Sequence, residues 1–449
     1  MGNVDIKDHS DHEVDQIVDE VSLASVSLNQ LSQQERTQKL MVLGELLMSR
    51  KKELAEVMHL EMGKQIAEGI AEIEKCKWVC NYYAENGREF LEPKQISTNY
   101  HKSYVTYQPL GTILAIMPWN FPFWQVFRFL APSLMLGNTA VLKHASNVRK
   151  SAYEIEKLVI QAGFPKNVFR NVFVGSKKVK RIIENDKINA ITLTGSTPAG
   201  KSVAELAGRH LKKLVLELGG SDPYLILEDA LISEAVKRCV KGRMLNCGQS
   251  CIGAKRFIVV DKVYDHFLDE FIVEMKKYSM DFETNSGMRI GPMAKKEIRN
   301  ELHEMVLLSM EKGATLELGG YLPDKNEPYY PATILTNVKK GMPAYSEEFF
   351  GPVASIIRVH NEEEAIKVAN DTSFGLGAAI FSQNIEKAED LAKNKLNAGA
   401  CFVNDFVKSD PRLPFGGVKE SGFGRELSLW GIHEFANIKT ICVDNLSDE

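Results

Sequence analysis

The first residue that could carry chemistry is Cys251, in the stretch LNCGQSCIGAKR from Leu245 to Arg256. This loop of small residues joins a segment of helical periodicity to the apolar run RFIVV, and Gly248 gives its backbone access to unusual dihedral angles. A thiol attacks as its thiolate, and a free cysteine titrates at about 8.5. A reactive Cys251 therefore needs a base and oxyanion donors from elsewhere in the chain. On this stretch alone, a small buried apolar residue is the more common role for a cysteine.

Two other side chains could supply those parts. Glu217 ends the apolar run KKLVLE and precedes two glycines, so it could act as a general base with a pKa raised by burial. A salt-bridged glutamate at a strand end is the alternative. Asn120 stands in PWNFP, where two prolines fix the backbone, and a rigid amide is a suitable oxyanion donor. For Asn120 the alternative is an Asx-turn residue.

Size and composition restrict the class of protein. At 449 residues, the chain is long enough for two or three domains. Its net charge of −4 offers no basic field for nucleic acid. No apolar run reaches the ~18 residues that a membrane-spanning helix needs, and the polar N-terminus lacks the apolar core of a secretory signal. The seven scattered cysteines have no partners at zinc spacing, so we expect a reducing, cytoplasmic setting without disulfides or a metal site.

The elements that must position these residues follow a clear order. Residues 11 to about 92 have helical periodicity, with Ser32 as a cap and Gly63 as a stop. From Gly111, short apolar runs alternate with helices, which predicts a parallel sheet covered on both faces, a Rossmann-like doubly wound domain. Asp222-Pro223 interrupts this pattern, and a second α/β unit follows. Residues 96–110 alternate like an exposed strand or hairpin, and an edge strand of this kind often pairs with another subunit.

Ligands of doubly wound sheets bind at the carboxyl ends of the strands. Trp119 and Asn120 follow the first predicted strand, and Lys143 follows the second. Gly195 and Ser196 come directly after the fourth strand and open a helix, whose N-terminus attracts phosphate oxygens. An ordinary N-cap is the alternative for them. The dinucleotide fingerprint GxGxxG is absent, so the fold prediction rests on the alternation.

Several motifs together resemble the aldehyde dehydrogenase superfamily over roughly residues 30–449, in order and in spacing. They are PWNFP, VLKHA, TGST, ELGG, NCGQSC, EEFFGPV and PFGGVKESGFGRE. The overall look is closest to the short succinate-semialdehyde dehydrogenase-like and glyceraldehyde dehydrogenase group. By this resemblance Cys251 is the nucleophile, Glu217 the general base and Asn120 an oxyanion donor. The residues implied for cofactor binding are Trp119, Lys143, Ser146, Gly195, Ser196, Glu348 and Phe350.

The resemblance also implies an architecture and a reaction. Residues 1–95 and 111–221 would form the NAD(P)-binding domain, residues 222–433 the catalytic domain, and segments 96–110 and 434–449 the oligomerisation strands of a dimer or tetramer. An aldehyde would be oxidised to a carboxylic acid through a thiohemiacetal and a thioester on Cys251. A catalytically silent relative with a structural or binding role is the alternative, and the intact set of motifs argues against it.

Ser146 bears on the choice of cofactor. Many NAD-preferring relatives carry a glutamate there, and its carboxylate would repel the 2′-phosphate of NADP, whereas a serine can donate a hydrogen bond to it. Lys177 and Lys178 could add positive charge. We therefore predict NADP use, with NAD possible.

The substrate prediction starts from Arg128. Asn120, Trp124 and Arg128 are spaced i, i+4, i+8, as on one helix face, and a charge in the apolar run WQVFRFLAP needs a substrate or protein carboxylate. Succinate-semialdehyde dehydrogenases are similar here and at Ser409. They often carry a second arginine where this chain has Leu245, with Arg243 two residues earlier. Succinate semialdehyde is the predicted substrate, and glyceraldehyde or lactaldehyde is the alternative.

Cys247 stands four residues before the nucleophile, where the family usually has a small residue. A packed thiol is one interpretation. The other is a redox lock with Cys251.

Overall fold

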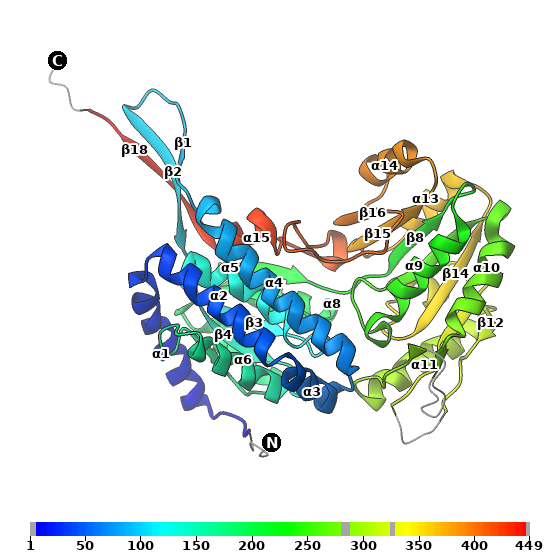
Figure 1. The fold of residues 1–449 in the computed structure, drawn as a ribbon, viewed down its shortest axis with the longest axis horizontal. Coiled ribbons are helices and arrows are strands. Elements are labelled where there is room, and N and C mark those ends of the chain that lie inside the picture. Colours follow the sequence, from blue (N-terminus) through cyan, green and yellow to red (C-terminus); the bar gives the residue numbers. More distant parts are fainter. Residues whose placement is uncertain (1–5, 280–287, 324–327, 446–449) are drawn as a thin grey trace.

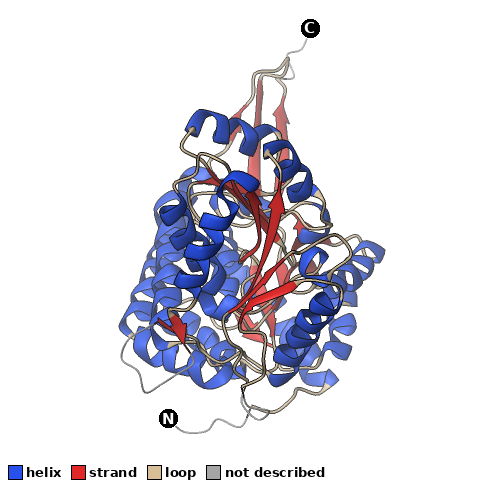
Figure 2. Ribbon diagram, turned by 90° about the vertical axis from the view of Figure 1, so that its right-hand side faces the viewer, coloured by secondary structure: helices blue, strands red, loops and turns tan. Residues whose placement is uncertain are grey.

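The computed structural model describes residues 6–279, 288–323 and 328–445. Two α/β units lie side by side, and a narrow three-stranded sheet extends from the first of them (Figure 1). Helices surround the sheets of both units (Figure 2). The predicted architecture, a Rossmann-like doubly wound unit with a second α/β unit and a small β-extension, is confirmed.

The first unit is built on a six-stranded sheet with the order β17-β7-β6-β3-β4-β5, parallel except for β17. Its strands are β3 (Thr112–Met117), β4 (Thr139–His144), β5 (Phe169–Asn171), β6 (Ile188–Thr194), β7 (Lys213–Glu217) and β17 (Gly422–Phe423). Continuous apolar runs form the parallel strands because helices cover both faces of the sheet. The strand order reverses between β3 and β6, and such a reversal opens a ligand-binding crevice at the carboxyl ends of the strands.

The helices of the first unit include the predicted N-terminal group. They are α1 (Asp11–Gln30), α2 (Gln33–Ser49), α3 (Lys51–Met62), α4 (Ile66–Phe90), α5 (Trp124–Leu136), α6 (Arg149–Gln161), η1 (Ser176–Lys178), α7 (Val179–Glu184) and α8 (Thr197–Arg209). Ser32 caps α2 in a reciprocal capping box with Glu35. Gly63 ends α3 in the left-handed conformation, at φ +75°. The helix expected from Ser32 to Gly63 is broken into two at Arg50.

The second unit has a seven-stranded sheet with the order β12-β13-β14-β9-β8-β15-β16, parallel except for β12. Its strands are β8 (Asp222–Ile226), β9 (Ala254–Val260), β12 (Thr315–Leu318), β13 (Thr333–Thr336), β14 (Val353–Val359), β15 (Gly377–Phe381) and β16 (Ala400–Val403). A separate pair is β10 (Tyr278–Ser279) with β11 (Met288–Arg289). The helices are α9 (Ile232–Met244), η2 (Leu245–Gly248), α10 (Asp261–Met275), α11 (Lys296–Glu311), α12 (Pro343–Ser346), α13 (Glu362–Asn370) and α14 (Ile385–Asn394).

The chain passes from the first sheet to the second between the end of β7 at Glu217 and the start of β8 at Asp222. It returns before residue 433. After η3 (Lys419–Ser421), strand β17 pairs with β7 so that Gly422 faces Glu217 in the register, and α15 (Ser428–Glu434) follows. The returning segment thereby reaches the end of the strand that carries the predicted base.

The extension consists of β1 (Lys94–Gln95), β2 (Lys102–Pro109) and β18 (Ala436–Val443). Strand β18 is antiparallel to β2 over its whole length, from Ala436 opposite Pro109 to Val443 opposite Lys102. The two segments predicted as oligomerisation strands therefore lie in one sheet, although residues 446–449 of the second fall outside the described chain. Among the described helices, none combines the length and the apolar character that crossing a membrane requires.

Candidate active site

The loop that carries Cys251 is held in an unusual backbone conformation. Asn246, Cys247 and Gly248 have positive φ angles of 55°, 55° and 71°. A Cβ atom at Gly248 would lie 2.3 Å from a neighbouring backbone carbonyl oxygen, so only glycine fits there. The buried guanidinium of Arg243 donates to the carbonyl oxygen of Gly248. Backbone conformation and an internal cation together fix the loop between α9 and β9.

Cys251 lies between two cavities and lines both of them. One, of about 350 Å³, is bordered by α4, α5 and the loop around Ser409. The other, of about 260 Å³, lies at the carboxyl ends of β3 and β6, beside Trp119 and Ser196. We call them the substrate-side cavity and the cofactor-side cavity. A thiol at their junction can contact a molecule in each.

The surroundings of Cys251 favour the neutral thiol. Burial raises the pKa of Cys251 to about 12, against the positive charges of Arg128 and Lys255, which lower it. The negative charges of Glu348 and Glu217 add to the rise. Attack on a substrate therefore requires the thiol proton to be removed as the reaction proceeds.

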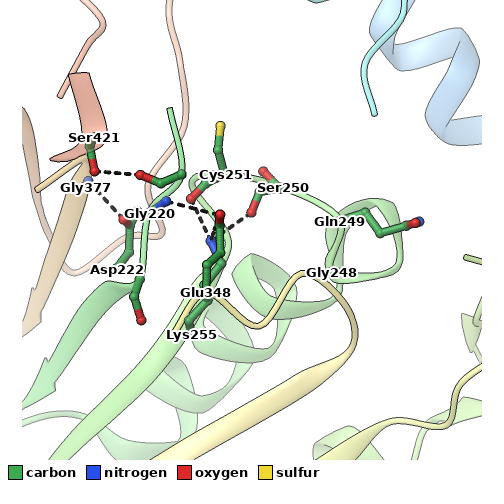
Figure 3. Close-up of polar contacts among 12 residues, drawn as sticks. Gly220, Asp222, Gly248, Gln249, Ser250, Cys251, Lys255, Glu348, Gly377 and Ser421 are labelled. Carbon is green, nitrogen blue, oxygen red and sulfur yellow. Dashed lines mark hydrogen bonds and ion pairs between the residues drawn. The ribbon is translucent and has the colours of Figure 1, made fainter. Parts of the chain in front are cut away.

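Lys255, which the sequence analysis did not single out, is the hub of the polar contacts below Cys251 (Figure 3). Its buried ammonium donates to the carbonyl oxygens of Ser250 and Cys251, at 2.9 and 2.7 Å, and lies 3.2 Å from a carboxylate oxygen of Glu348. The same oxygen of Glu348 accepts the backbone N–H of Gly220 at 3.1 Å. The sulfur of Cys251 points away from this network. Lys255 thus holds the Cys251 loop from behind and ties it to Glu348.

Glu217 is almost fully buried, with 1% of its surface exposed. Neither of its carboxylate oxygens has a hydrogen-bond partner within the described residues. Burial and the negative charge of Glu426 raise the pKa of Glu217 well above its usual range, whereas Arg128 and Arg425 act in the opposite direction. The strand-end glutamate thus has a raised pKa, as the prediction of a general base expects, and it is not among the described residues that line the two cavities.

Arg128 was predicted to need either a substrate carboxylate or a protein carboxylate, and the structure pairs it with a protein carboxylate. Its Nε atom lies 2.6 Å from Oε2 of Glu426, and both side chains are 2% exposed. Its guanidinium carbon is 4.7 Å from the ring centroid of Phe415. Arg128 also borders the substrate-side cavity, as expected of a substrate residue, but its charge is already paired.

Asn120 lies in the turn after β3, close to the Cys251 loop. Its Nδ2 atom donates to the carbonyl oxygen of Gln249 at 3.2 Å, and its backbone oxygen accepts from Asn246 at 2.9 Å. An amide has two N–H donors, so one remains for an oxyanion. The prediction that Asn120 shares a helix face with Trp124 and Arg128 is wrong, because α5 begins only at Trp124, and Asn120 borders the cofactor-side cavity instead.

Five of the seven residues predicted to bind a cofactor border the cofactor-side cavity. The rings of Trp119 and Phe350 meet edge to face, with centroids 5.8 Å apart. Ser196 is the N-cap of α8, and its hydroxyl makes no capping bond within the described chain, so it can reach a phosphate at the helix N-terminus. A Cβ atom on Gly219 would lie 2.3 Å from a carboxylate oxygen of Glu348, so glycine keeps this wall open. The five residues are Trp119, Gly195, Ser196, Glu348 and Phe350.

Lys143 and Ser146, the remaining two, lie at and just after the end of β4, with Ser146 exposed. Burial lowers the pKa of Lys143. Lys178, which was suggested to add charge for a 2′-phosphate, already has two partners. Its ammonium lies 2.8 Å from Asp11 and donates to the carbonyl of His9, so it is bound to the segment around the start of α1. Lys177 is exposed. Lys143 and Ser146 are not among the residues that line the cofactor-side cavity, so their part in cofactor binding stays a prediction.

The substrate-side cavity contains Trp124 and Ser409, as predicted, and one residue that was missed, Lys75 of α4. Its ammonium donates to the hydroxyl of Ser409 at 2.8 Å and lies 4.5 Å from the ring centroid of Trp124. Leu245 lines this cavity, whereas Arg243 is turned to the loop backbone. The described residues include no group of three or more His, Cys, Asp or Glu side chains placed to hold a metal ion.

Cys247 has the environment of a packed thiol. It is 5% exposed and belongs to the hydrophobic core of the second unit, whereas Cys251 packs against the core of the first. Burial raises the pKa of Cys247 above its usual range. Both cysteines are free in the structure. This placement favours the packed-thiol interpretation over the redox lock.

Comparisons with known proteins agree with the resemblance. A probable succinate-semialdehyde dehydrogenase [NADP(+)] of Synechocystis sp. is 46% identical over 435 residues, which cover 97% of this chain and 96% of the relative. The crystal structure of a Streptococcus pyogenes succinic semialdehyde dehydrogenase in complex with NADP+ matches with a TM-score of 0.94 at 37% identity, over 98% of this chain and 97% of that one. A structure of a lactaldehyde dehydrogenase has a TM-score of 0.93 at 28% identity, over 98% and 93% of the chains.

The near-equal scores of the last two show that the overall fold does not distinguish their substrates. The description "Aldehyde dehydrogenase family" belongs to a family model that matches residues 3–441, and this range contains every site residue described above. The chain therefore belongs to the aldehyde dehydrogenase family.

Proposed function

We propose that this protein oxidises succinate semialdehyde to succinate, with NADP as the hydride acceptor. The observation that carries the proposal is the position of Cys251 at the junction of two cavities. One is lined by five of the residues predicted to bind the cofactor, and the other is bordered by apolar side chains and Lys75. The names of the relatives of similar length, at 46% and 37% identity, support both the substrate and the cofactor.

The first step is the addition of the Cys251 sulfur to the aldehyde carbon. The thiol gives its proton to solvent water, the C–S bond forms, and the carbonyl electrons move to the oxygen. The free N–H of Asn120, held by Gln249, is placed to donate to this oxyanion, and such a donor contributes roughly 10²–10³ in rate. Bound NADP would accept the hydride from the former aldehyde carbon. Loss of the hydride converts the adduct on Cys251 into a thioester.

Glu217 is proposed as the base of the hydrolysis that follows. It would take a proton from water while the water oxygen adds to the thioester carbon, and the C–S bond would then break to release the acid. Because both oxygens of Glu217 lack hydrogen-bond partners in the described chain, they are free to accept from a water. The raised pKa makes the carboxylate a stronger base than an exposed glutamate.

The exposed hydroxyl of Ser146 supports NADP as the preferred cofactor, with NAD tolerated, because a carboxylate at this site would repel a 2′-phosphate. We also propose a homodimer or homotetramer built on the extension, whose strand β18 leaves exposed side chains along most of its length. The seven free cysteines support a cytoplasmic location.

Initial rates with purified protein test the proposal. NADP and NAD are crossed with succinate semialdehyde, glyceraldehyde, lactaldehyde and butanal. The highest kcat/KM is expected for NADP with succinate semialdehyde, and Cys251→Ala should abolish turnover. Preference for glyceraldehyde or lactaldehyde would replace the substrate. Full turnover by Cys251→Ala, or no rate with any pair, would favour a structural or binding role.

A further inference from the structure

The substrate-side cavity contains three cations, and two of them are already neutralised. Arg128 is paired with Glu426 at 2.6 Å in the protein interior. Lys408 lies 2.7 Å from a carboxylate oxygen of Asp405 and is half exposed, so solvent screens its charge. Neither of these two cations needs a ligand to balance it.

Two glutamates border the same cavity, and both are occupied. Glu72 is paired with the buried ammonium of Lys64. Glu68 accepts the backbone N–H of Asn246 at 2.7 Å, and burial raises its pKa. The charge of Glu72 is therefore balanced, and Glu68 is tied to the Cys251 loop by its bond to Asn246.

Lys75 is different, because its ammonium has no ion-pair partner within the described residues. Its contacts are the hydroxyl of Ser409, at 2.8 Å, and the face of Trp124, at 4.5 Å. An ammonium surrounded by apolar walls is costly unless an anion joins it. The hydroxyl of Ser409 accepts from Lys75, so its own proton remains available to a second acceptor. Lys75 and Ser409 together can donate to the two oxygens of one carboxylate.

We propose that Lys75, with Ser409, binds the distal carboxylate of the substrate and makes the enzyme selective for ω-carboxylated aldehydes. This inference rests on the proposed function. It assigns the carboxylate first to Lys75, since the charge of Arg128 is already paired with Glu426.

The charge state of Lys75 agrees with this role. Burial and the positive charge of Arg128 on α5 lower the pKa of Lys75 to about 8. Cys76 and Glu72 on its own helix and Asp410 on the facing loop act in the opposite direction. Lys75 is therefore charged at neutral pH and becomes neutral above about pH 8, when a carboxylate would lose its partner.

The test compares Lys75→Met with Lys408→Met, because both lysines border the same cavity and only one is unpaired. Each variant is assayed with succinate semialdehyde and with butanal, which has the same four carbons and no carboxylate. Lys75→Met should raise the KM for succinate semialdehyde roughly 10–100-fold, the value of a charge-assisted hydrogen bond, and leave kcat/KM for butanal within about threefold. Lys408→Met should change neither by more than about threefold.

A second measurement uses only the wild-type protein and is informative even if Lys75→Met fails to fold. The ratio of kcat/KM for succinate semialdehyde to that for butanal cancels titrations of Cys251 and Glu217, which both substrates share. This ratio should fall above about pH 8 as Lys75 loses its proton. A flat ratio from pH 6.5 to 9.5 would overturn the inference.

The outcomes separate this inference from the proposed function. If the wild-type protein does not prefer succinate semialdehyde to butanal at pH 7, the proposed function fails. If the wild type has that preference and Lys75→Met retains it, only the role of Lys75 is refuted. Equal losses of kcat/KM for both substrates in Lys75→Met would show that the residue is structural and would likewise refute its role in specificity.

Discussion

Within the described chain, Arg128 is the only cation that forms an ion pair with Glu426. Both side chains also influence the pKa of Glu217, Arg128 by lowering it and Glu426 by raising it. Replacing Arg128 by methionine keeps most of the apolar stem and removes the cation. Two buried carboxyl groups then remain, each of which raises the cost of charging the other. We expect Arg128→Met to be strongly destabilising because these two buried carboxyl groups lose their cation, rather than because packing is lost.

The size of the effect follows from burial. Both partners are 2% exposed, so solvent hardly screens the pair. Removing one partner of such a buried pair costs about 3–5 kcal/mol, since an uncompensated charge remains inside the protein. The double variant Arg128→Met/Glu426→Gln leaves no unpaired charge of this pair, and it should recover at least about half of the loss.

The loss of free energy of unfolding in Arg128→Met should also depend on pH, and the pKa shifts set the direction of that dependence. Arg128 lowers the pKa values of Glu217 and Glu426, so its removal raises both further above the usual 4.5. A carboxyl group with a raised pKa holds more protons in the folded than in the unfolded protein above pH 4.5, so stability falls as the pH rises. Arg128→Met should therefore lose more free energy of unfolding at pH 8 than at pH 5.5.

Urea unfolding, followed by tryptophan fluorescence at one protein concentration and at both pH values, measures these free energies. The charge argument is refuted if the loss is the same at pH 8 and pH 5.5. It is also refuted if the double variant is as unstable as Arg128→Met, because lost packing alone would give that result.

Ser146→Glu should lower the ratio of kcat/KM for NADP to that for NAD at least about tenfold, as charge repulsion of a 2′-phosphate requires, whereas Ser146→Ala serves as the uncharged control. Gly422→Ala should destabilise the protein by more than about 2 kcal/mol in urea unfolding, because φ is +112° and the new Cβ would lie 2.0 Å from the Leu216 carbonyl oxygen. Lys255→Met should slow the inactivation of Cys251 by iodoacetamide at pH 9, since Lys255 lowers the pKa of that thiol. An unchanged rate would remove this electrostatic role.

Much of the site could be predicted because its residues belong to local motifs at strand ends. The parallel alternation placed Trp119, Gly195 and Ser196 at one edge of a sheet, and the structure brings them to one cavity. Helix spacing gave the wrong position for Asn120, because α5 begins after the two prolines of PWNFP rather than before them. Local sequence thus identified the residues better than their orientation.

The residues that were missed depend on long-range contacts. Lys75 and Ser409 are 334 positions apart, and no periodicity in α4 marks Lys75 as a cavity residue. Lys255 did leave a signal. It stands with Arg256 in AKRFIVV, a strand whose residues are all buried, and two charges in such a strand must find partners. Arg256 donates to three backbone carbonyls, and Lys255 to two and to Glu348.

The high pKa of the resting thiol is consistent with the role of Cys251 as a nucleophile. The low polarity around the sulfur that raises this pKa to about 12 also surrounds the oxyanion that forms on an attached substrate. In such a site the N–H of Asn120 acts on the oxyanion with little screening. The charge moves from sulfur to oxygen during the attack, so the environment that disfavours a free thiolate need not disfavour the adduct. A neutral resting thiol is also less open to oxidation, which follows thiolate character. The same surroundings therefore protect the Cys251 thiol from oxidation before substrate arrives. After the attack they strengthen the hydrogen bond that Asn120 donates to the oxyanion.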